Sequence, residues 1–220
     1  MSTVLISGAS RGIGLEFARQ YAAGGWDVIA TARRPDDADK LHQLDVQVFR
    51  LDAADPTSIE ELAQQLSGRS IDVVIANAGV MGPPNLDLQD WLAVFAANSV
   101  GPTLLAHALK TNVAASAERK MIAITSQMGS IGDNGTGGSI TYRASKAALN
   151  AAWRSLSIDW RAEGITLAML HPGWVRTDMG GPNAQIEPRD SVSGMRRPIA
   201  GLSPDRSGAF LNYDGQELPW

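Results

Sequence analysis

The sequence has 220 residues and contains no cysteine, which excludes disulfide bridges and thiolate-bound metals. Its three histidines are scattered and have no carboxylates at the spacing of a metal site, so no metal is expected. No run of about 18 apolar residues is present, and the amino-terminal apolar run is too short for a secretory signal. These absences make the cytoplasm the expected location.

The sequence also has no excess of positive charge. Lysine and arginine together number 19 against 23 aspartates and glutamates, giving a formal net charge of −4. Nucleic acids and anionic membranes both attract clustered positive charge, so we expect neither as a partner. The apolar share of 44% and the charged share of 19% are typical of a globular core. With no linker or low-complexity tract, residues 1–220 are predicted to form a single domain.

Short apolar segments alternate with longer segments of helical period. The strands are predicted at residues 4–7, 28–31, 46–51, 71–76, 121–125 and 166–170, and the helices at 13–23, 59–66, 90–109 and 142–161. Asp55 and Pro56 provide a cap residue and a helix-opening proline for the second helix. Strands that are apolar on both faces belong in a parallel sheet covered by helices on both sides. The alternation therefore predicts an α/β fold with a doubly wound parallel sheet. Three prolines and several polar residues in and around residues 180–197 predict a partly irregular substrate lid near 178–198.

A glycine-rich turn joins the first strand to the first helix. It reads Ser7-Gly8-Ala9-Ser10-Arg11-Gly12-Ile13-Gly14. Glycines at this junction allow a tight turn and let a pyrophosphate approach the backbone, and the helix start favours its negative charge. The spacing of the glycines differs from the common dinucleotide fingerprint, and a glycine-rich turn without a ligand remains the alternative. We predict that Gly8, Ser10, Arg11, Gly12, Ile13 and Gly14 bind a dinucleotide.

The end of the second strand indicates which dinucleotide binds. An NAD site usually has a carboxylate there, which binds the ribose 2′-hydroxyl. This strand continues instead into Arg33 and Arg34. A guanidinium offers paired donors to a 2′-phosphate, and Arg11 would add a second positive contact. The sequence therefore favours NADPH or NADP+, bound by Arg33, although both arginines could instead be solvated turn residues balanced by Asp36 and Asp37.

Tyr142 and Lys146 stand four positions apart in a segment of helical period, which places them on one helix face. A free phenol has a pKa of about 10, too high for proton exchange near neutrality. We expect the ammonium to lower that pKa and make Tyr142 a general acid or base. Such a pair also arises by chance on many helices. Ser126 strengthens the interpretation, because it is predicted at the carboxyl edge of the sheet, where open α/β folds bind ligands.

Read in order, the motifs form one pattern over nearly the whole chain. They are the glycine loop, Asn77-Ala78-Gly79, Asn98, Ser126, the Tyr142–Lys146 pair and Pro172-Gly173. This pattern resembles the short-chain dehydrogenase/reductase family. The resemblance implies a Rossmann-type fold with a seven-stranded parallel sheet and helices on both faces. It also implies a small-molecule carbonyl or alcohol substrate and a homo-oligomer, with the helices that begin near Asp90 and Tyr142 at the subunit contacts.

The resemblance implies a role for each of four catalytic residues. Tyr142 would be the acid or base, and Ser126 would hydrogen-bond the substrate carbonyl. Lys146 would hold the ribose hydroxyls of the nicotinamide half, and Asn98 would organise a proton relay through water. Because Pro102 has no amide hydrogen, the Asn98 carbonyl loses its helical partner, and we expect it to hold that water.

The resemblance also assigns further residues to the cofactor. Asn77, Ala78 and Gly79 would pack beside the adenosine ribose, and Asp52, with Ala53 next to it, would meet the adenine. Pro172 and Gly173 would cover the nicotinamide, with the Val175 backbone and the Thr177 hydroxyl nearest its carboxamide. Two alternatives stay open, since Asp52 could merely cap a turn and Asn77 could merely satisfy a loop.

Finer features resemble the C-factor and sniffer-like branch of the family. Ser126 precedes Tyr142 by sixteen positions, more than in most members, and the sequences around His171-Pro172-Gly173-Trp174 and 210–215 are similar to that branch. The branch implies an NADPH-dependent carbonyl reductase. Two alternatives remain: an alcohol dehydrogenase that works oxidatively with the same residues, and a nucleotide-binding signalling protein with little catalysis.

Overall fold

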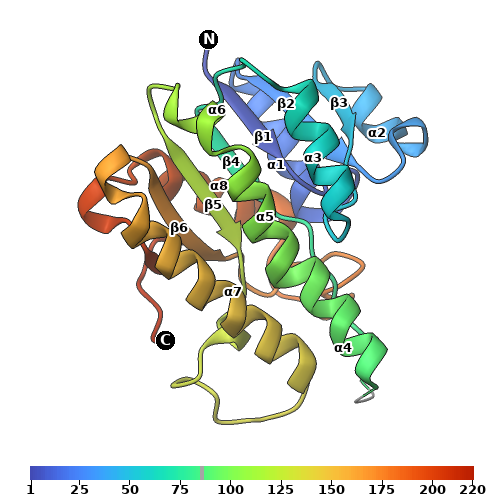
Figure 1. Ribbon diagram of the computed structural model, residues 1–220. Coiled ribbons are helices and arrows are strands. Elements are labelled where there is room, and N and C mark those ends of the chain that lie inside the picture. The colour runs from blue at the N-terminus through green and yellow to red at the C-terminus, as the bar shows by residue number, and fades with distance from the viewer. Residues whose placement is uncertain (85–86) are drawn as a thin grey trace.

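A computed structural model describes residues 1–84 and 87–220 and contains one parallel sheet of seven strands (Figure 1). The strands are β1 (Thr3–Ile6), β2 (Asp27–Ala32), β3 (Gln47–Arg50), β4 (Val73–Ala76), β5 (Lys120–Ile124), β6 (Thr166–His171) and β7 (Ala209–Asn212). Their order is β3-β2-β1-β4-β5-β6-β7, and every neighbouring pair is parallel. The predicted doubly wound sheet is confirmed. The chain order reverses between β1 and β4, which is where such sheets bind ligands.

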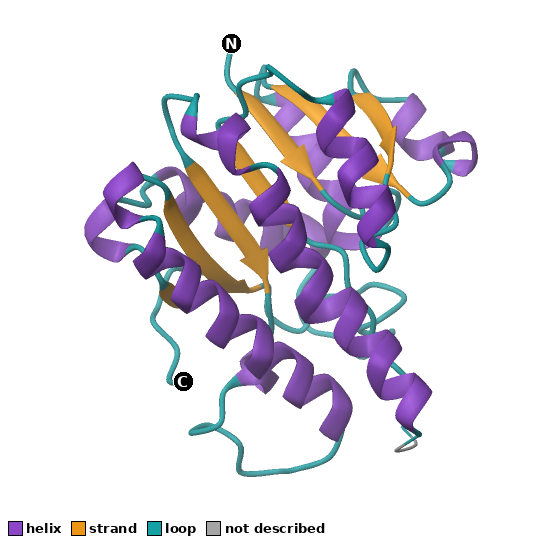
Figure 2. Ribbon diagram, in the orientation of Figure 1, coloured by secondary structure: helices purple, strands orange, loops and turns teal. Residues whose placement is uncertain are grey.

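Helices cover both faces of this sheet (Figure 2). They are α1 (Gly12–Ala23), α2 (Asp39–His42), α3 (Pro56–Gln65), α4 (Leu88–Phe95), α5 (Gly101–Ala108), α6 (Lys110–Ala114), α7 (Ile140–Asp159) and α8 (Pro188–Ala200). One core lies between the sheet and α1, α2 and α8, and the other lies between the sheet and α3, α5 and α7. The inner strands face both cores and are therefore mostly apolar, which is why they stood out as apolar runs, whereas the edge strand β3 is partly exposed.

Local signals set the start of α3. The Asp55 side chain accepts a hydrogen bond from the Thr57 amide at 3.0 Å, and Pro56 occupies the first helical position. Proline suits that position because its missing amide hydrogen would have had no helical partner. The sequence signals therefore place this helix start correctly.

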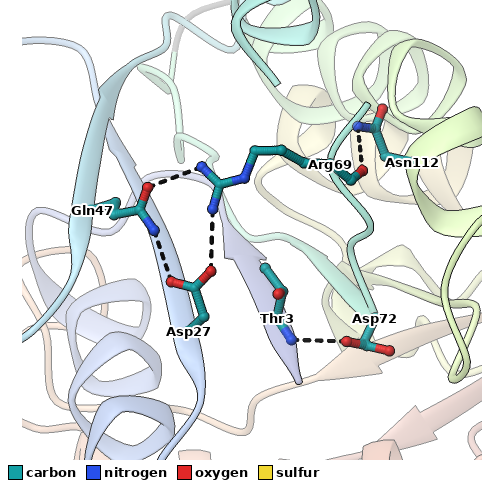
Figure 3. Close-up of polar contacts among 6 residues, drawn as sticks. All are labelled: Thr3, Asp27, Gln47, Arg69, Asp72 and Asn112. Atoms are coloured by element: carbon teal, nitrogen blue, oxygen red, sulfur yellow. Dashed lines mark hydrogen bonds and ion pairs between the residues drawn. The ribbon is translucent and has the colours of Figure 1, made fainter. Parts of the chain in front are cut away.

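A polar brace ties together the amino ends of the strands (Figure 3). Arg69, just before β4, donates hydrogen bonds to Asp27 on β2 and to Gln47 on β3, at 3.1 and 2.9 Å. Gln47 donates in turn to Asp27 at 2.8 Å. Asp72 accepts from the Thr3 amide at 2.8 Å. These contacts fix the edge of the sheet that lies opposite the glycine loop.

Two segments differ from the sequence prediction. The predicted helix at 90–109 contains a π-helical turn at Ala96–Val100, where the Gly101 amide donates to the Ala96 carbonyl. Single π turns of this kind occur often at functional sites. The predicted lid is irregular only up to Glu187, because Pro188 then opens the regular helix α8, which continues past Pro198. The segment is thus irregular in its first part and helical in its second, where Pro188 at the first helical position favours a helix.

No helix among residues 1–84 and 87–220 is long and apolar enough to cross a membrane. Within the same residues there is no cluster of histidine, aspartate and glutamate side chains that could hold a metal ion.

Candidate active site

A cavity of about 290 Å³ opens at the carboxyl ends of the strands, where the chain order reverses between β1 and β4. Fifteen of the predicted site residues line it: Gly8, Ser10, Arg11, Gly12, Ile13, Arg33, Asp52, Ala53, Asn77, Ala78, Gly79, Tyr142, Lys146, Pro172 and Thr177. These residues come from segments spread over most of the chain. The fold therefore brings the glycine loop and the Tyr142–Lys146 pair into one cavity.

The glycine loop is packed too closely for larger side chains. Gly8 and Gly12 have φ values of +67° and +57°, which side chains rarely adopt. A Cβ on Gly14 would lie 2.3 Å from the Gly8 carbonyl oxygen and 2.6 Å from Asn77 Nδ2. Gly14 does not line the cavity; it lets α1 start directly against the loop. This cradle of backbone amides at a helix start fits a pyrophosphate.

Asn77 holds the glycine loop in place. Its Nδ2 donates hydrogen bonds to the Ser7 and Gly8 carbonyls, at 3.0 and 3.2 Å. The Ser7 hydroxyl accepts in return from the amides of Asn77 and Ala78, at 2.9 and 3.0 Å. Asn77 therefore provides hydrogen bonds to the backbone of the glycine loop, as one of the two alternatives expected. The same residue also lines the cavity.

The two arginines after β2 occupy different surroundings. Arg33 lines the cavity and, within the described chain, forms no ion pair. Arg34 lies outside the cavity lining and pairs with Asp37 at 3.0 Å, in an exposed turn. Asp52 lines the cavity while its Oδ1 accepts from the Ala54 amide at 3.0 Å. Asp52 therefore caps a turn as well as facing the cavity. Arg33 is the arginine placed to meet a 2′-phosphate.

Tyr142 lies near the start of α7 and is only 8% exposed. Burial raises the pKa of its phenol above 10.0, and a hydrogen bond with the Ser126 side chain opposes that shift. Ser126 caps the short helical turn after β5, where its hydroxyl accepts from the Met128 amide at 3.1 Å. Ser130, the next serine along the chain, instead accepts a hydrogen bond from the Asp133 amide. Ser126 is therefore the serine beside the tyrosine.

Lys146 is buried, one helical turn after Tyr142. Its Nζ donates to the Ile124 carbonyl at 2.9 Å and lies 5.9 Å from the centre of the Tyr142 ring. Burial lowers the pKa of Lys146 to about 8. The sequence-based expectation that this ammonium lowers the tyrosine pKa is not met, because burial has the larger effect on the phenol. Tyr142 is therefore a protonated phenol at neutral pH.

Asn98 lies in the π turn and is fully buried, so it does not line the cavity. Its Oδ1 accepts from the Val80 amide, and its Nδ2 donates to the Val80 carbonyl, both at 2.8 Å. The same Nδ2 donates to the Ser145 hydroxyl at 3.0 Å. The side chain thus joins α7 to the loop after β4. The water at the Asn98 carbonyl, expected because of Pro102, stays a prediction.

The turn after β6 forms the wall on the lid side. Pro172 and Thr177 line the cavity, whereas Gly173 and Val175 do not. Val175 is 4% exposed and pairs with Ile186 in a short parallel bridge. A Cβ on Gly173 would lie 2.4 Å from Ile186. Gly173 and Val175 therefore pack this turn against the lid, with their side-chain positions directed away from the cavity.

Comparison with known proteins agrees with this arrangement. The family model for short chain dehydrogenases matches residues 2–187. The chain belongs to that family. The C-signal protein of Myxococcus xanthus is 47% identical over 154 residues, which cover 68% of this chain and 93% of that protein.

Solved short-chain dehydrogenases share the whole fold. The NADPH-bound carbonyl reductase from chicken fatty liver has a TM-score of 0.92 and 34% identity, covering 100% of this chain and 99% of that one. The carbonyl reductase Sniffer of D. melanogaster has a TM-score of 0.91 and 31% identity, covering 100% of both chains. The predicted family and its C-factor and sniffer-like relatives are confirmed.

Sequence motifs missed several residues of this short-chain dehydrogenase cavity. They are Ala32, Leu51, Ala54, Val80, Ala97, Ile124, Thr125 and Asp178. Most are apolar or small residues next to a motif. Their position next to that motif was the only feature of the sequence that could have placed them at the cavity. Asp178 in the lid forms an ion pair with Arg11 in the glycine loop at 3.1 Å. The Asp178 side chain is 78% exposed and the Arg11 side chain is 71% exposed. An ion pair so exposed adds little stability.

Because the His171 imidazole is buried, we expect the folded protein to lose stability in acid. Burial lowers its pKa to about 4 from 6.5, and its Nδ1 is buried without a partner in the described chain. Below about pH 6.5 the unfolded chain binds a proton that the folded protein accepts only near pH 4. The free energy of unfolding should therefore fall by up to about 3 kcal/mol as the pH decreases across this window.

Urea unfolding at several pH values measures this effect. His171→Gln should flatten the decrease, whereas His42→Gln, at the exposed end of α2, should leave it unchanged. Equal pH slopes for the wild type and His171→Gln would show that the buried imidazole is not responsible.

Proposed function

We propose that this protein reduces a ketone or aldehyde to an alcohol with NADPH. The observation that carries the proposal is a buried Tyr142 that lines the same cavity as the glycine loop. When bound, NADPH supplies the hydride for the carbonyl carbon. Gly8 and Gly12 line the cavity, and Gly14 lets α1 start directly against the loop, an arrangement that fits the pyrophosphate of such a cofactor.

The residues of the chain supply position and a proton. Tyr142 donates its phenolic proton to the carbonyl oxygen as negative charge develops there. Ser126, which hydrogen-bonds the phenol, orients the same oxygen. Lys146 donates from Nζ and, with its pKa near 8, stabilises the phenolate that proton transfer leaves behind.

Turnover is tested by following NADPH oxidation with a panel of aliphatic and aromatic ketones and aldehydes. The apolar Met179 at the cavity favours a small or medium apolar carbonyl compound. Turnover of corresponding alcohols with NADP+, and of no carbonyl, would favour the oxidative alternative.

Arg33 is expected to set the cofactor preference. Arg33→Ala should weaken NADPH binding about tenfold or more, because a 2′-phosphate loses its guanidinium partner, and should leave NADH binding unchanged. Arg34→Ala is the matched control, since Arg34 pairs with Asp37 outside the cavity. Titration of each cofactor against each variant measures the effect. Tighter binding of NADH than NADPH to the wild type would overturn the assignment.

The 47% identity to C-signal favours a second candidate, a nucleotide-binding signalling protein with little catalysis. Such a protein would bind NADPH without turning over any carbonyl. The presence of Ser126, Tyr142 and Lys146 supports the proposal of an enzyme instead, because cofactor binding alone does not require a proton donor.

We further propose a homo-oligomer in the cytoplasm. Large apolar side chains on the outer faces of α4, α5 and α7 and on the π turn support the oligomer: Leu88, Leu92, Val100, Leu104, Ile140 and Ile158 are each at least 37% exposed. Burying them against another copy would remove apolar surface from water. The molar mass in solution tests this, and a monomer of about 23.4 kDa would contradict it.

A further inference from the structure

A second cavity lies at the opposite edge of the sheet from the glycine loop. It has a volume of about 480 Å³ and shares no lining residue with the first cavity. Its walls come from the end of α1, from α8 and from the amino ends of β4 and β5, where Val73 and Lys120 begin their strands. Its size is within the usual range for a small-molecule site.

Aromatic side chains form one wall of this second cavity. The rings of Tyr21 and Trp26 meet edge to face, with centroids 4.9 Å apart. The guanidinium carbon of Arg196 lies 4.6 Å from the centre of the Tyr21 ring. Val73 and Ile199 add aliphatic surface. The Tyr21 ring is 3% exposed and stacks on Phe17, so it supports Trp26 from behind. A ligand with a flat apolar body would find the partly exposed Trp26 ring and aliphatic contacts here.

The second cavity is lined by more positively than negatively charged side chains. Glu118 is the one acidic side chain in the described lining, and it pairs with Lys120 at 2.6 Å. Lys120 Nζ also donates to the Ala200 carbonyl at 2.9 Å, so this lysine is already engaged. Arg196 donates to the Gln20 carbonyl at 3.1 Å. In the described chain, neither Arg196 nor Arg197 pairs with a carboxylate, which leaves two positive charges on α8 at the cavity.

We propose that the second cavity binds a small aromatic carboxylate. The planar guanidinium fork of an arginine matches the two oxygens of a carboxylate, and the aromatic body would lie against Trp26. The site is separate from the proposed reductase chemistry, so either proposal can fail without the other.

The experiment uses the full chain, 2-naphthoate as the probe and neutral 2-naphthamide as its matched control. Six tryptophans give indole N–H signals in a ¹H–¹⁵N spectrum, and Trp26→Phe assigns the signal of Trp26. Addition of 2-naphthoate should move the Trp26 signal, and the amide should bind about tenfold more weakly or worse. No shift of the Trp26 signal, or equal affinity for the acid and the amide, would overturn the proposal.

Variants of α8 test the arginines. The double variant Arg196→Gln/Arg197→Gln should weaken 2-naphthoate binding about tenfold or more. Arg197→Gln alone, at an exposed position, guards against a folding defect and should weaken binding in the same direction. Arg189→Gln changes the same charge on the same helix outside the cavity and should bind like the wild type. Wild-type affinity in both Arg197 variants would contradict the proposal.

Discussion

Tyr142→Phe should lower the turnover number for carbonyl reduction by about 10²- to 10⁴-fold. The substitution removes only the phenolic oxygen, which carries the proton that the carbonyl oxygen needs. Because the ring is 8% exposed, phenylalanine should preserve the packing of α7. Steady-state kinetics with NADPH and the best carbonyl of the panel measures the loss, and cofactor titration should give a dissociation constant close to that of the wild type.

Tyr213→Phe is the matched control. It removes the same oxygen from a tyrosine that packs beside Gly173 and Gly194, outside the described cavity lining, and should retain wild-type turnover. A Tyr142→Phe variant that keeps more than about a tenth of the activity would show that another group donates the proton. A wild type that binds NADPH but reduces no carbonyl would favour the signalling candidate.

Gly14→Ala should damage both stability and cofactor binding. The new Cβ would lie 2.3 Å from the Gly8 carbonyl oxygen and 3.0 Å from the Ala9 Cα, and both belong to the backbone of the glycine loop. The loop must move to relieve the clash, which should cost about 1–3 kcal/mol of unfolding free energy. The displaced amides should also weaken NADPH binding about tenfold or more.

Urea unfolding and NADPH titration measure the two effects of Gly14→Ala. The control is Gly135→Ala, because a Cβ there has no atom within 4 Å and the backbone φ is not positive. We expect that control to match the wild type in both measurements. If Gly14→Ala bound NADPH normally, the close packing of α1 on the loop would not be what positions the phosphate site.

The sequence predicted the sheet well because the signals were local. Six strands were found as apolar runs, and Asp55 with Pro56 correctly set the start of α3. The glycine loop was equally readable, since its conformation depends on residues that are adjacent in the chain. The lid was predicted only as partly irregular, because its prolines did not show where a helix could begin. Packing of α8 on α1 stabilises the helix from Pro188 onward.

Several site features depended on contacts that no local pattern records. Arg33 and Arg34 are equivalent in sequence, yet only Arg33 lines the cavity, because the turn directs Arg34 toward Asp37. The side-chain amide of Asn98 joins Val80 to Ser145, which lies 47 positions away in the chain, and no local pattern showed this contact.

The sequence by itself determined the α/β class, the dinucleotide loop and the pairing of Tyr142 with Lys146, since each rests on periodicity or on a spacing of a few residues. Only the tertiary structure decided the charge states at the site. Burial raises the pKa of Tyr142 and lowers that of Lys146 to about 8. The lysine is held by the Ile124 carbonyl, 22 positions earlier. Desolvation depends on every segment that folds around a group, so it is a property of the packed chain and not of any motif.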